Sequence, residues 1–313
     1  MVVYRGLDDR RLRRRPAAVA VGNFDGLHAG HRKILAHLCR LARRRGLRSV
    51  VLTFDPHPER ALGKRSVRMI DTPEQRLARL RATCVDAVVV IPFDRAFAAL
   101  ASEAFVKGVL RDKLGAREVV VGRDFRFGKD RRGDVALLRR LGREAGFGLH
   151  AVPPAALGGR TVSSTAIRSL LGRGRVDEAA RMLGRPYEIC GRVVPGKKRG
   201  RLLGYPTANL DTANEILPEG IYVSETVLGG KAHPSLTSIG TNPTFGPNPL
   251  TVETLLLDYR GSLYRREITV RLLLRLRPPR AFAGADALAA GIRRDIARAR
   301  AWFAQPGRGS RAA

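Results

Sequence analysis

The chain has 313 residues, of which 44% are hydrophobic and 27% are charged, a balance typical of globular proteins and not of disordered chains. At about 150 residues per domain, this length predicts two domains. No apolar run approaches the roughly 18–20 residues that span a bilayer, and the N-terminus lacks the apolar segment of a signal peptide. We therefore expect a cytoplasmic protein without a membrane partner.

The net charge of +30 at pH 7 raises the possibility of a nucleic-acid partner. However, Arg is spread over the whole chain, and dense runs occur only at residues 10–15 and 43–45. Aromatic residues make up 6% of the chain and do not alternate with basic residues as stacking platforms would. We therefore interpret the charge as solvated surface and expect no specific nucleic-acid partner.

The cysteines Cys39, Cys84 and Cys190 are too few and too scattered to predict a disulfide framework or a zinc site. The sequence therefore predicts reduced thiols.

The first half of the chain alternates strand-like apolar runs with helix-like periodicity. After the apolar run Ala17–Val21 comes a helix that ends at Gly46. Thr72 can cap a later helix with Pro73 at its first position. This alternation predicts an α/β domain with a parallel sheet. The other expected strands are 49–54, 85–91, 118–121 and 148–152, and the other expected helices are 102–114 and 134–145.

The character of the sequence changes near Gly184-Arg185-Pro186. Beyond this point, β-rich runs are separated by turns rich in Gly and Pro, and no helix is expected before Ala285–Phe303. This pattern predicts an antiparallel barrel or sandwich with one C-terminal helix. The expected strands are 188–194, 221–226, 236–239, 252–257 and 268–274. We place the domains at 1–184 and 185–305, with a flexible tail at 306–313.

The segment between the first strand and the first helix carries the strongest chemical signal. Its residues 22–31 read Gly-Asn-Phe-Asp-Gly-Leu-His-Ala-Gly-His. Ligands of open α/β sheets bind at the carboxyl ends of strands, and a helix N-terminus there suits a phosphate. His28 and His31 are three residues apart and share a helix face, while Gly30 permits close approach of a ligand. The alternative, that each His is a capping or exposed residue, is weakened by this spacing.

A second motif, Val162-Ser163-Ser164-Thr165-Ala166-Ile167-Arg168, supports this interpretation. Ser163 or Ser164 can cap the following helix, and Arg168 would face a phosphate from its first turns. Taken alone, the motif could equally be an ordinary helix cap with a surface Arg. Together, the two motifs resemble the signatures of the HxGH nucleotidyltransferase superfamily.

Further stretches narrow the resemblance and extend it over nearly the whole chain. They are similar, in the same order, to the bacterial bifunctional riboflavin kinase/FAD synthetase family. The stretches are residues 53–58, 120–128, 184–187, 199–210, 220–222, 239–245 and 251–258. The resemblance implies a Rossmann-like parallel-sheet domain followed by a Greek-key antiparallel β-barrel with a C-terminal helix. It also implies ATP-dependent phosphorylation of riboflavin to FMN in the second domain, and adenylylation of FMN to FAD in the first.

For the adenylyl transfer, the resemblance implies that His28 and His31 contact the triphosphate of ATP. Arg168, with Ser164 and Thr165, would hold the leaving pyrophosphate. Asp55 and His57 either line the site or only shape a turn. The residues implied to line the nucleotide and flavin pocket are Gly22, Asn23, Phe24, Asp25, Gly30, Asp124, Ser163, Ser164 and Thr165.

The second domain carries no P-loop, so a kinase site there must cradle phosphate by other means. Thr207 and Asn209 alternate along an extended segment, and the resemblance implies that they ligate Mg²⁺. Glu253 lies within an apolar run and is, from the pattern alone, a surface or a functional carboxylate; the resemblance implies that it is the general base. The residues implied to bind substrate or nucleotide here are Gly196, Arg199, Gly200, Arg201, Gly204 and Pro206.

Three loop positions depart from the family pattern. Arg265 replaces a usual Gly, the segment around Pro279 lacks a common acidic residue, and Lys197 stands where an acidic or small residue is frequent. These departures leave a second hypothesis open, in which only the adenylyl transfer is active. A third hypothesis is an RNA-binding protein on a nucleotidyltransferase scaffold. The sequence does not predict the oligomeric state.

Overall fold

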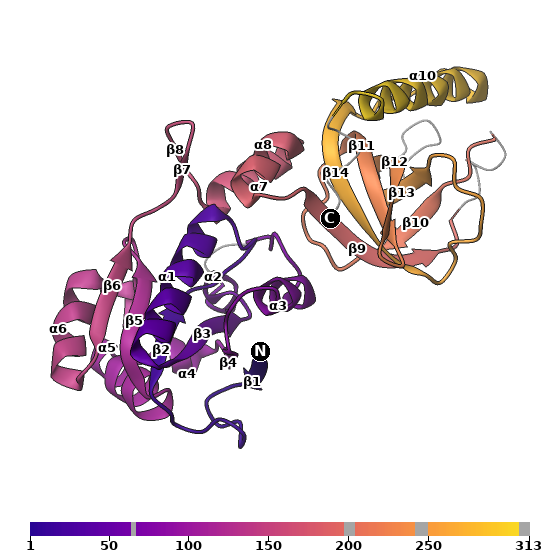
Figure 1. Ribbon diagram of the computed structural model, residues 1–313. Helices are drawn as coiled ribbons and strands as arrows, with labels where there is room; N and C mark the ends of the chain where they lie inside the picture. The colour runs from indigo at the N-terminus through magenta and orange to yellow at the C-terminus, as the bar shows by residue number, and fades with distance from the viewer. Residues whose placement is uncertain (64–66, 197–203, 242–249, 307–313) are drawn as a thin grey trace. The chain divides into compact units, whose positions relative to one another are not determined.

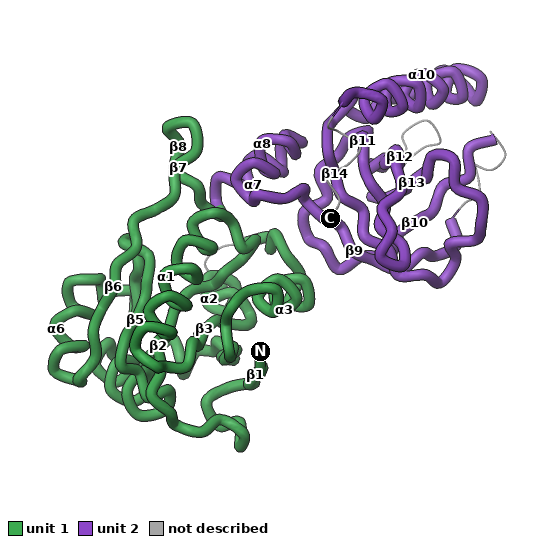
Figure 2. Tube along the Cα trace, viewed as in Figure 1, with its two compact units in different colours: residues 1–164 green, residues 165–313 purple. Residues whose placement is uncertain are grey.

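The computed structural model describes residues 1–63, 67–196, 204–241 and 250–306. The chain divides into two compact units, residues 1–164 and 165–313 (Figure 2). The predicted boundary between residues 184 and 185 remains a proposal. Among the described residues, no helix combines the length and apolarity needed to cross a membrane.

The first unit is built around a sheet of six strands, all paired in parallel, in the order β1-β4-β3-β2-β5-β6 (Figure 1). The predicted parallel sheet is therefore confirmed, while the short N-terminal strand was not predicted. The strands are β1 (Val2–Arg5), β2 (Ala17–Val21), β3 (Arg48–Asp55), β4 (Ala87–Pro92), β5 (Ala116–Gly122) and β6 (Gly148–Val152).

Helices cover both faces of this sheet, which explains why its central strand is apolar at every position. All of β2 is buried, and its alternate residues enter two separate cores. Val19 packs on the face covered by η1 and α6, whereas Ala18 packs on the face covered by α1 and α3. The bounds of these helices are α1 (Ala29–Arg45), α3 (Pro73–Arg81), η1 (Phe105–Lys113) and α6 (Val135–Ala145).

The helix expected over 102–114 differs from the prediction in its geometry. It begins as one α turn, α5 (Ser102–Ala104), and continues as the π-helix η1. Apolar side chains of η1, including Val106 and Leu110, are fully buried against the sheet. The apolar pattern therefore places a buried helix correctly but does not distinguish a π-helix from an α-helix. The remaining short elements of the unit are α2 (Pro58–Ala61), α4 (Arg95–Ala98), η2 (Lys129–Arg131), β7 (Ala156–Leu157) and β8 (Arg160–Thr161).

The prediction that the thiols are reduced is wrong for two of the three cysteines. Cys39 and Cys84 form a disulfide, with their Cα atoms 6.2 Å apart, and Cys190 is free. Cys39 lies on the buried side of α1, and Cys84 lies in the turn before β4. Packing of this helix on the sheet brings the two together from positions 45 residues apart, which sequence spacing does not reveal.

The second unit contains a closed antiparallel barrel with the strand order β10-β13-β12-β11-β14-β9. β11, β12 and β13 are consecutive neighbours, and β14 returns beside β11, which is the Greek-key arrangement. The predicted barrel is confirmed, and the C-terminal helix α10 (Ala285–Phe303) has the predicted bounds. The strands are β9 (Tyr187–Val194), β10 (Ala208–Asp211), β11 (Gly220–Leu228), β12 (Lys231–Gly240), β13 (Thr251–Leu256) and β14 (Glu267–Arg277).

Helices flank this barrel. The unpredicted helix α8 (Val176–Leu183) packs against β14 and β9, and α7 (Ser164–Gly172) precedes it. α10 packs against β11 and β12, where Ala299 joins an apolar cluster with Val223 and Leu236. Arg277 of β14 fixes the same helix, because its Nε and Nη2 donate to the Asp295 carboxylate at 3.0 and 2.7 Å.

Inside the barrel, five hydroxyl side chains form a closed ring of hydrogen bonds. Thr226 donates to Ser235 at 3.0 Å, and Thr237 donates to Thr254 at 2.9 Å. Ser224 closes one side through Ser235 at 2.9 Å and Thr237 at 2.7 Å. Thr254 and Thr226 close the other side at 3.2 Å. All five are fully buried, and each can donate once and accept once, so the ring satisfies polar groups that burial would otherwise penalise.

Two candidate active sites

The first candidate site lies where β2 leads into α1. His28 is the N-cap of this helix, and its Nδ1 accepts a hydrogen bond from the His31 backbone N–H at 3.4 Å. The two imidazole rings stack, with their centroids 3.7 Å apart and their planes 19° apart. Since Nδ1 is an acceptor, a neutral His28 carries its proton on Nε2. The structure therefore brings the two predicted histidines together at a helix N-terminus.

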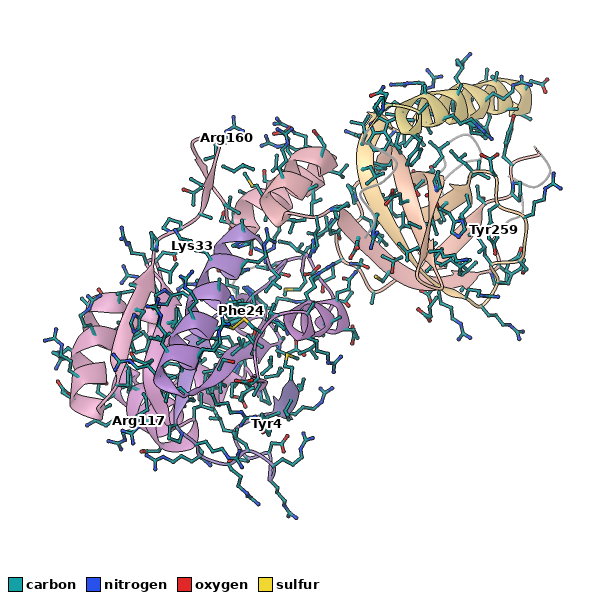
Figure 3. All side chains as sticks on the ribbon, in the orientation of Figure 1. Tyr4, Phe24, Lys33, Arg117, Arg160 and Tyr259 are labelled. Atoms are coloured by element: carbon teal, nitrogen blue, oxygen red, sulfur yellow. A yellow bond between two sulfur atoms is a disulfide. The ribbon has the colours of Figure 1, made fainter. Side chains whose placement is uncertain are left out.

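Glycines allow this loop to pack closely around the histidines. A Cβ atom at Gly30 would lie 3.1 Å from Cε1 of His28, which is tighter than ordinary contact. At Gly22 it would lie 3.3 Å from the ring of Phe24. Phe24, labelled in Figure 3, is itself fully buried and has the positive φ of 51° that side chains seldom adopt. Both glycines therefore serve the shape of the loop.

The Asp25 side chain holds the loop between β2 and α1 in place. Its side chain is buried, with 1% exposed, and its carboxylate accepts backbone N–H groups from Ile70 at 3.0 Å and from Asp71 at 3.2 Å. Its own carbonyl accepts the Ser164 hydroxyl at 3.0 Å, which joins the two sequence motifs. These contacts show Asp25 and Ser164 holding the segment that carries the histidines.

Asn23 connects the loop to the turn after β3. Its side-chain amide lies 2.9 Å from Nε2 of His57, and the Nδ1 of this His accepts the Glu59 N–H at 3.3 Å as the cap of α2. His57 therefore both shapes the turn and contacts a predicted site residue. Arg76 was not predicted: it is 2% exposed and donates to the carbonyl of Asn23 at 3.4 Å and to that of Phe54 at 3.1 Å.

The other residues predicted for this site lie after β5 and on or just before α7. Asp124 is exposed just after β5, and a Cβ at Gly122 would lie 2.9 Å from its Oδ1. Ser163 immediately precedes α7, and Thr165 and Arg168 lie on that helix, where Arg168 is half-buried.

The second candidate site lies on adjacent barrel strands. Asn209 of β10 is the direct ladder partner of Glu253 of β13. The Thr207 hydroxyl donates to Glu253 Oε2 at 3.2 Å, and the Thr251 hydroxyl lies 3.4 Å from Oε1 and 3.2 Å from the Gly240 carbonyl. The three predicted residues therefore meet. Thr251 was missed, although it is two residues from Glu253 on the same strand and so shares its face.

The loop before β10 also fits closely around this group. A Cβ at Gly196 would overlap the Asn209 side chain, at 2.1 Å from Nδ2. Gly204 and Pro206 lie on the segment that leads into Thr207, with Gly204 at φ 82°. The predicted residues Arg199, Gly200 and Arg201, and the departure at Lys197, lie outside the described residues.

Two family departures fall on described loops. Arg265 has the positive φ of 63°, the conformation that glycine adopts most readily, and its N–H bonds the carbonyl of Val193 at 2.9 Å. Pro279 lies beside the end of β12, because a Cβ at Gly240 would be 3.5 Å from its ring. The backbone at 265 therefore retains the shape of a glycine turn although the residue is Arg.

The donor set of the second site fits Mg²⁺, which prefers oxygen ligands. Thr207 and Asn209 supply a hydroxyl and an amide oxygen, beside the carboxylate of Glu253. Because Thr207 gives its proton to Glu253, lone pairs of its oxygen remain for a cation. Among the described residues, no group of three or more His, Cys, Asp or Glu is placed to hold a metal.

Both halves of the chain match known families in the predicted order. Residues 11–166 match the FAD synthetase family, and residues 183–303 match the riboflavin kinase family. The bifunctional riboflavin kinase/FMN adenylyltransferase of Pseudomonas fluorescens is 38% identical over 96% of this chain and 97% of its own. The chain belongs to this bifunctional family. The Escherichia coli K12 relative of the same name is 39% identical over 91% of this chain and 92% of its own.

A solved structure with a different description has the same fold. It is described as a macrolide-efflux protein from Streptococcus pneumoniae, and it is 28% identical, with a TM-score of 0.86 over 96% of this chain and 100% of its own. Neither the hypothesis of adenylyl transfer alone nor the RNA-binding hypothesis is favoured by these matches.

Proposed function

We propose that the chain makes FAD from riboflavin in two ATP-dependent steps and that the two sites described above carry them out. The barrel unit phosphorylates riboflavin to FMN, and the sheet unit adenylylates FMN to FAD with release of pyrophosphate. The observation that carries this conclusion is the match of both halves to the two families in one chain. The proposal includes a cytoplasmic location and small-molecule substrates, with no specific nucleic-acid partner.

In the adenylyl transfer, an FMN phosphate oxygen attacks the α-phosphorus of ATP, and the bond from that phosphorus to the pyrophosphate oxygen breaks. We assign His28 and His31 to the triphosphate, where their stacked rings and the helix N-terminus stabilise the charge that develops. Arg168, with Ser164 and Thr165, holds the departing pyrophosphate, and Ser163 contributes to nucleotide binding. Residues 22–25, Gly30 and Asp124 shape the nucleotide and flavin pocket.

In the kinase reaction, a ribityl hydroxyl of riboflavin attacks the γ-phosphorus of ATP, the bond from that phosphorus to the β,γ-bridging oxygen breaks, and ADP leaves. We assign Glu253 as the base that receives the hydroxyl proton, and the Thr207 hydroxyl orients the carboxylate for this role. Thr207 and Asn209 would hold Mg²⁺, which neutralises phosphate charge when bound. The backbone of the adjoining loop is shaped by Gly196, Gly204 and Pro206. From the sequence alone, we assign phosphate binding to Arg199, Gly200 and Arg201.

Flavin turnover tests this proposal directly. The purified chain is incubated with riboflavin, ATP and MgCl₂, and the flavins are separated by chromatography over time. We expect FMN to appear first and FAD to follow. Use of supplied FMN without use of riboflavin would leave only the adenylyl transfer, and failure to use either flavin would refute both assignments.

An RNA-binding assay addresses the remaining hypothesis. We expect weak binding that is the same for unrelated RNA sequences and falls steeply with added salt. Tight, sequence-selective binding would contradict the proposal that no specific nucleic-acid partner exists.

A further inference from the structure

A basic pocket beside α1 is not part of either candidate site. It has a volume of about 290 Å³ and lies between α1 and the last residues of β6. None of the residues predicted or observed in the two sites lines it. Its lining residues are Lys33, His37, Arg40, His150, Ala151, Val152 and Pro153.

The pocket gathers positive charge from one helix face. Lys33, His37 and Arg40 are spaced by four and three residues along α1, so they share a side of that helix. Lys33, labelled in Figure 3, and Arg40 are basic side chains that are exposed and line the pocket. Across from them, the His150 ring lies 5.1 Å from that of His37, measured between centroids.

One carboxylate, Glu118, contacts His150 in the lining of the pocket. Glu118 of β5 lies 2.9 Å from Nε2 of His150 and 3.6 Å from Nε of Arg45. The partners of the Glu118 carboxylate are therefore His150 and Arg45, and neither belongs to the α1 face formed by Lys33, His37 and Arg40. The pocket itself presents donors and positive charge to whatever enters it.

His37 provides the second, independent sign of a ligand. Its Nε2 is buried and makes no hydrogen bond with any part of the chain that the structure describes. Burial, His150 and Arg40 lower the pKa of His37 below its usual value of 6.5. A buried polar atom without a partner is uncommon in folded proteins, because it loses its bonds to water on folding.

We propose that this pocket binds a phosphate group, held by Lys33, Arg40 and the Nε2–H of His37. A phosphate offers several acceptor oxygens and a negative charge, which would satisfy the buried nitrogen and offset the repulsion between the two cations. The volume suits a small anion, such as phosphate or pyrophosphate, or the phosphate end of a larger molecule. This proposal does not depend on the function proposed above.

The test follows the His37 ring by NMR in the full chain labelled at histidine. The pKa of His37 is measured with and without sodium phosphate, and sodium chloride keeps the ionic strength equal. An anion that binds the protonated ring more tightly must raise this pKa, so we expect it to rise with phosphate. The absence of any effect beyond that of chloride would overturn the proposal.

Variants locate the effect. Lys33→Ala and Arg40→Ala should each raise, by about tenfold, the phosphate concentration that gives half of the His37 pKa shift. Each variant removes a charge-assisted contact to the phosphate. Arg44→Ala is the matched control, since Arg44 is an exposed cation on the same helix that does not line the pocket. A phosphate effect that survived in Lys33→Ala and Arg40→Ala, or that fell equally in the control, would show general attraction to a basic surface and refute the site.

The source of the phosphate is distinguished by parallel titrations with pyrophosphate and with AMP. A larger rise in the His37 pKa with pyrophosphate than with phosphate would support a free polyphosphate as the ligand. A larger shift with AMP would support a phosphate carried on a nucleoside. Circular dichroism of every variant confirms that it is folded.

Discussion

The two candidate sites are built in opposite ways. The first consists mainly of consecutive residues at one strand–helix junction, and a buried carboxylate, Asp25, fastens that loop to residues 70 and 71. The second depends on the register between two barrel strands, which brings Thr207 to Glu253 across 46 residues of sequence. A site of the first kind fails when its loop is disturbed, whereas one of the second kind fails when its strands shift. The two should therefore be separable by substitution.

Glu253→Gln gives the largest expected effect. It keeps the shape of the side chain but removes the base, so FMN formation should fall by about 10²–10⁴-fold. FAD formation from supplied FMN should be unchanged, because that reaction uses the other unit. Both rates are measured by chromatography of the flavins. Equal loss of both activities would contradict the separation of the sites.

His28→Ala is the reciprocal change. It removes one ring of the stacked pair and the N-cap of α1, so FAD formation should fall by about 10²–10³-fold while FMN formation continues. The same two assays report the result. FAD formation at the original rate would show that the imidazole does not act on the triphosphate.

Two glycine substitutions compare the sites by steric means alone. Gly196→Ala would overlap Asn209 at 2.1 Å, and Gly30→Ala would crowd His28 at 3.1 Å. We expect FMN formation to fall by tenfold or more in the first, and FAD formation to fall by a few-fold in the second, because the smaller overlap is relieved by a small shift. Gly108→Ala is the control, since no atom of the described residues lies within 4 Å of a Cβ placed there. An unchanged rate in Gly196→Ala would remove Asn209 from the kinase site.

Thr254→Val tests the register that the second site needs. It opens the hydroxyl ring and leaves buried partners unsatisfied, so the unfolding free energy should fall by about 1–3 kcal/mol. Urea unfolding measures this change. Thr269→Val is a comparison on β14, where the hydroxyl contacts Cys190 Sγ at 3.3 Å outside the ring. A loss no larger than that of the comparison would show that the ring adds no stability.

Tyr222→Phe should give the smallest effect: a small loss at every pH, because the Tyr222 hydroxyl donates to the Glu219 carbonyl at 3.2 Å, and a change in pH dependence in alkaline solution. Burial raises the pKa of Tyr222 from 10.0 to about 12. The stabilising contribution of the neutral phenol is therefore complete below pH 10 and is lost as the pH rises through 12. Over that range the free energy of unfolding should fall by no more than about 1.4 kcal/mol per pH unit from this group. Urea unfolding of the variant between pH 10 and 12 should depend less on pH, with the exposed Tyr264→Phe as control. If the unfolding free energy depended equally on pH in Tyr222→Phe and Tyr264→Phe, this prediction would be wrong.

Local signals made the sheet unit and its histidine pair predictable from the sequence. The apolar run of β2 and the glycine that ends α1 are strong short-range patterns, and the spacing of His28 and His31 already defines a helix face. The barrel strands were also recognisable as β-rich runs. Their pairing was not, since β-strand order depends on contacts between distant residues.

The features that were missed share a dependence on tertiary packing. β1 has four residues, too short for a reliable pattern, and exists because the longer β4 pairs with it. The Cys39–Cys84 disulfide, the buried Arg76 and the Thr251 contact to Glu253 arise only once elements pack together.

The circle of hydroxyls inside the barrel also has a handedness. The two bonds with an assigned donor, from Thr226 and from Thr237, run around it in one direction, and the other three can follow the same direction. Reversing the direction of donation around the ring would require all five hydroxyl groups to rotate together. Because water does not reach them, these protons can leave only when the barrel opens, so their exchange rate would record how often the strands that carry Glu253 come apart.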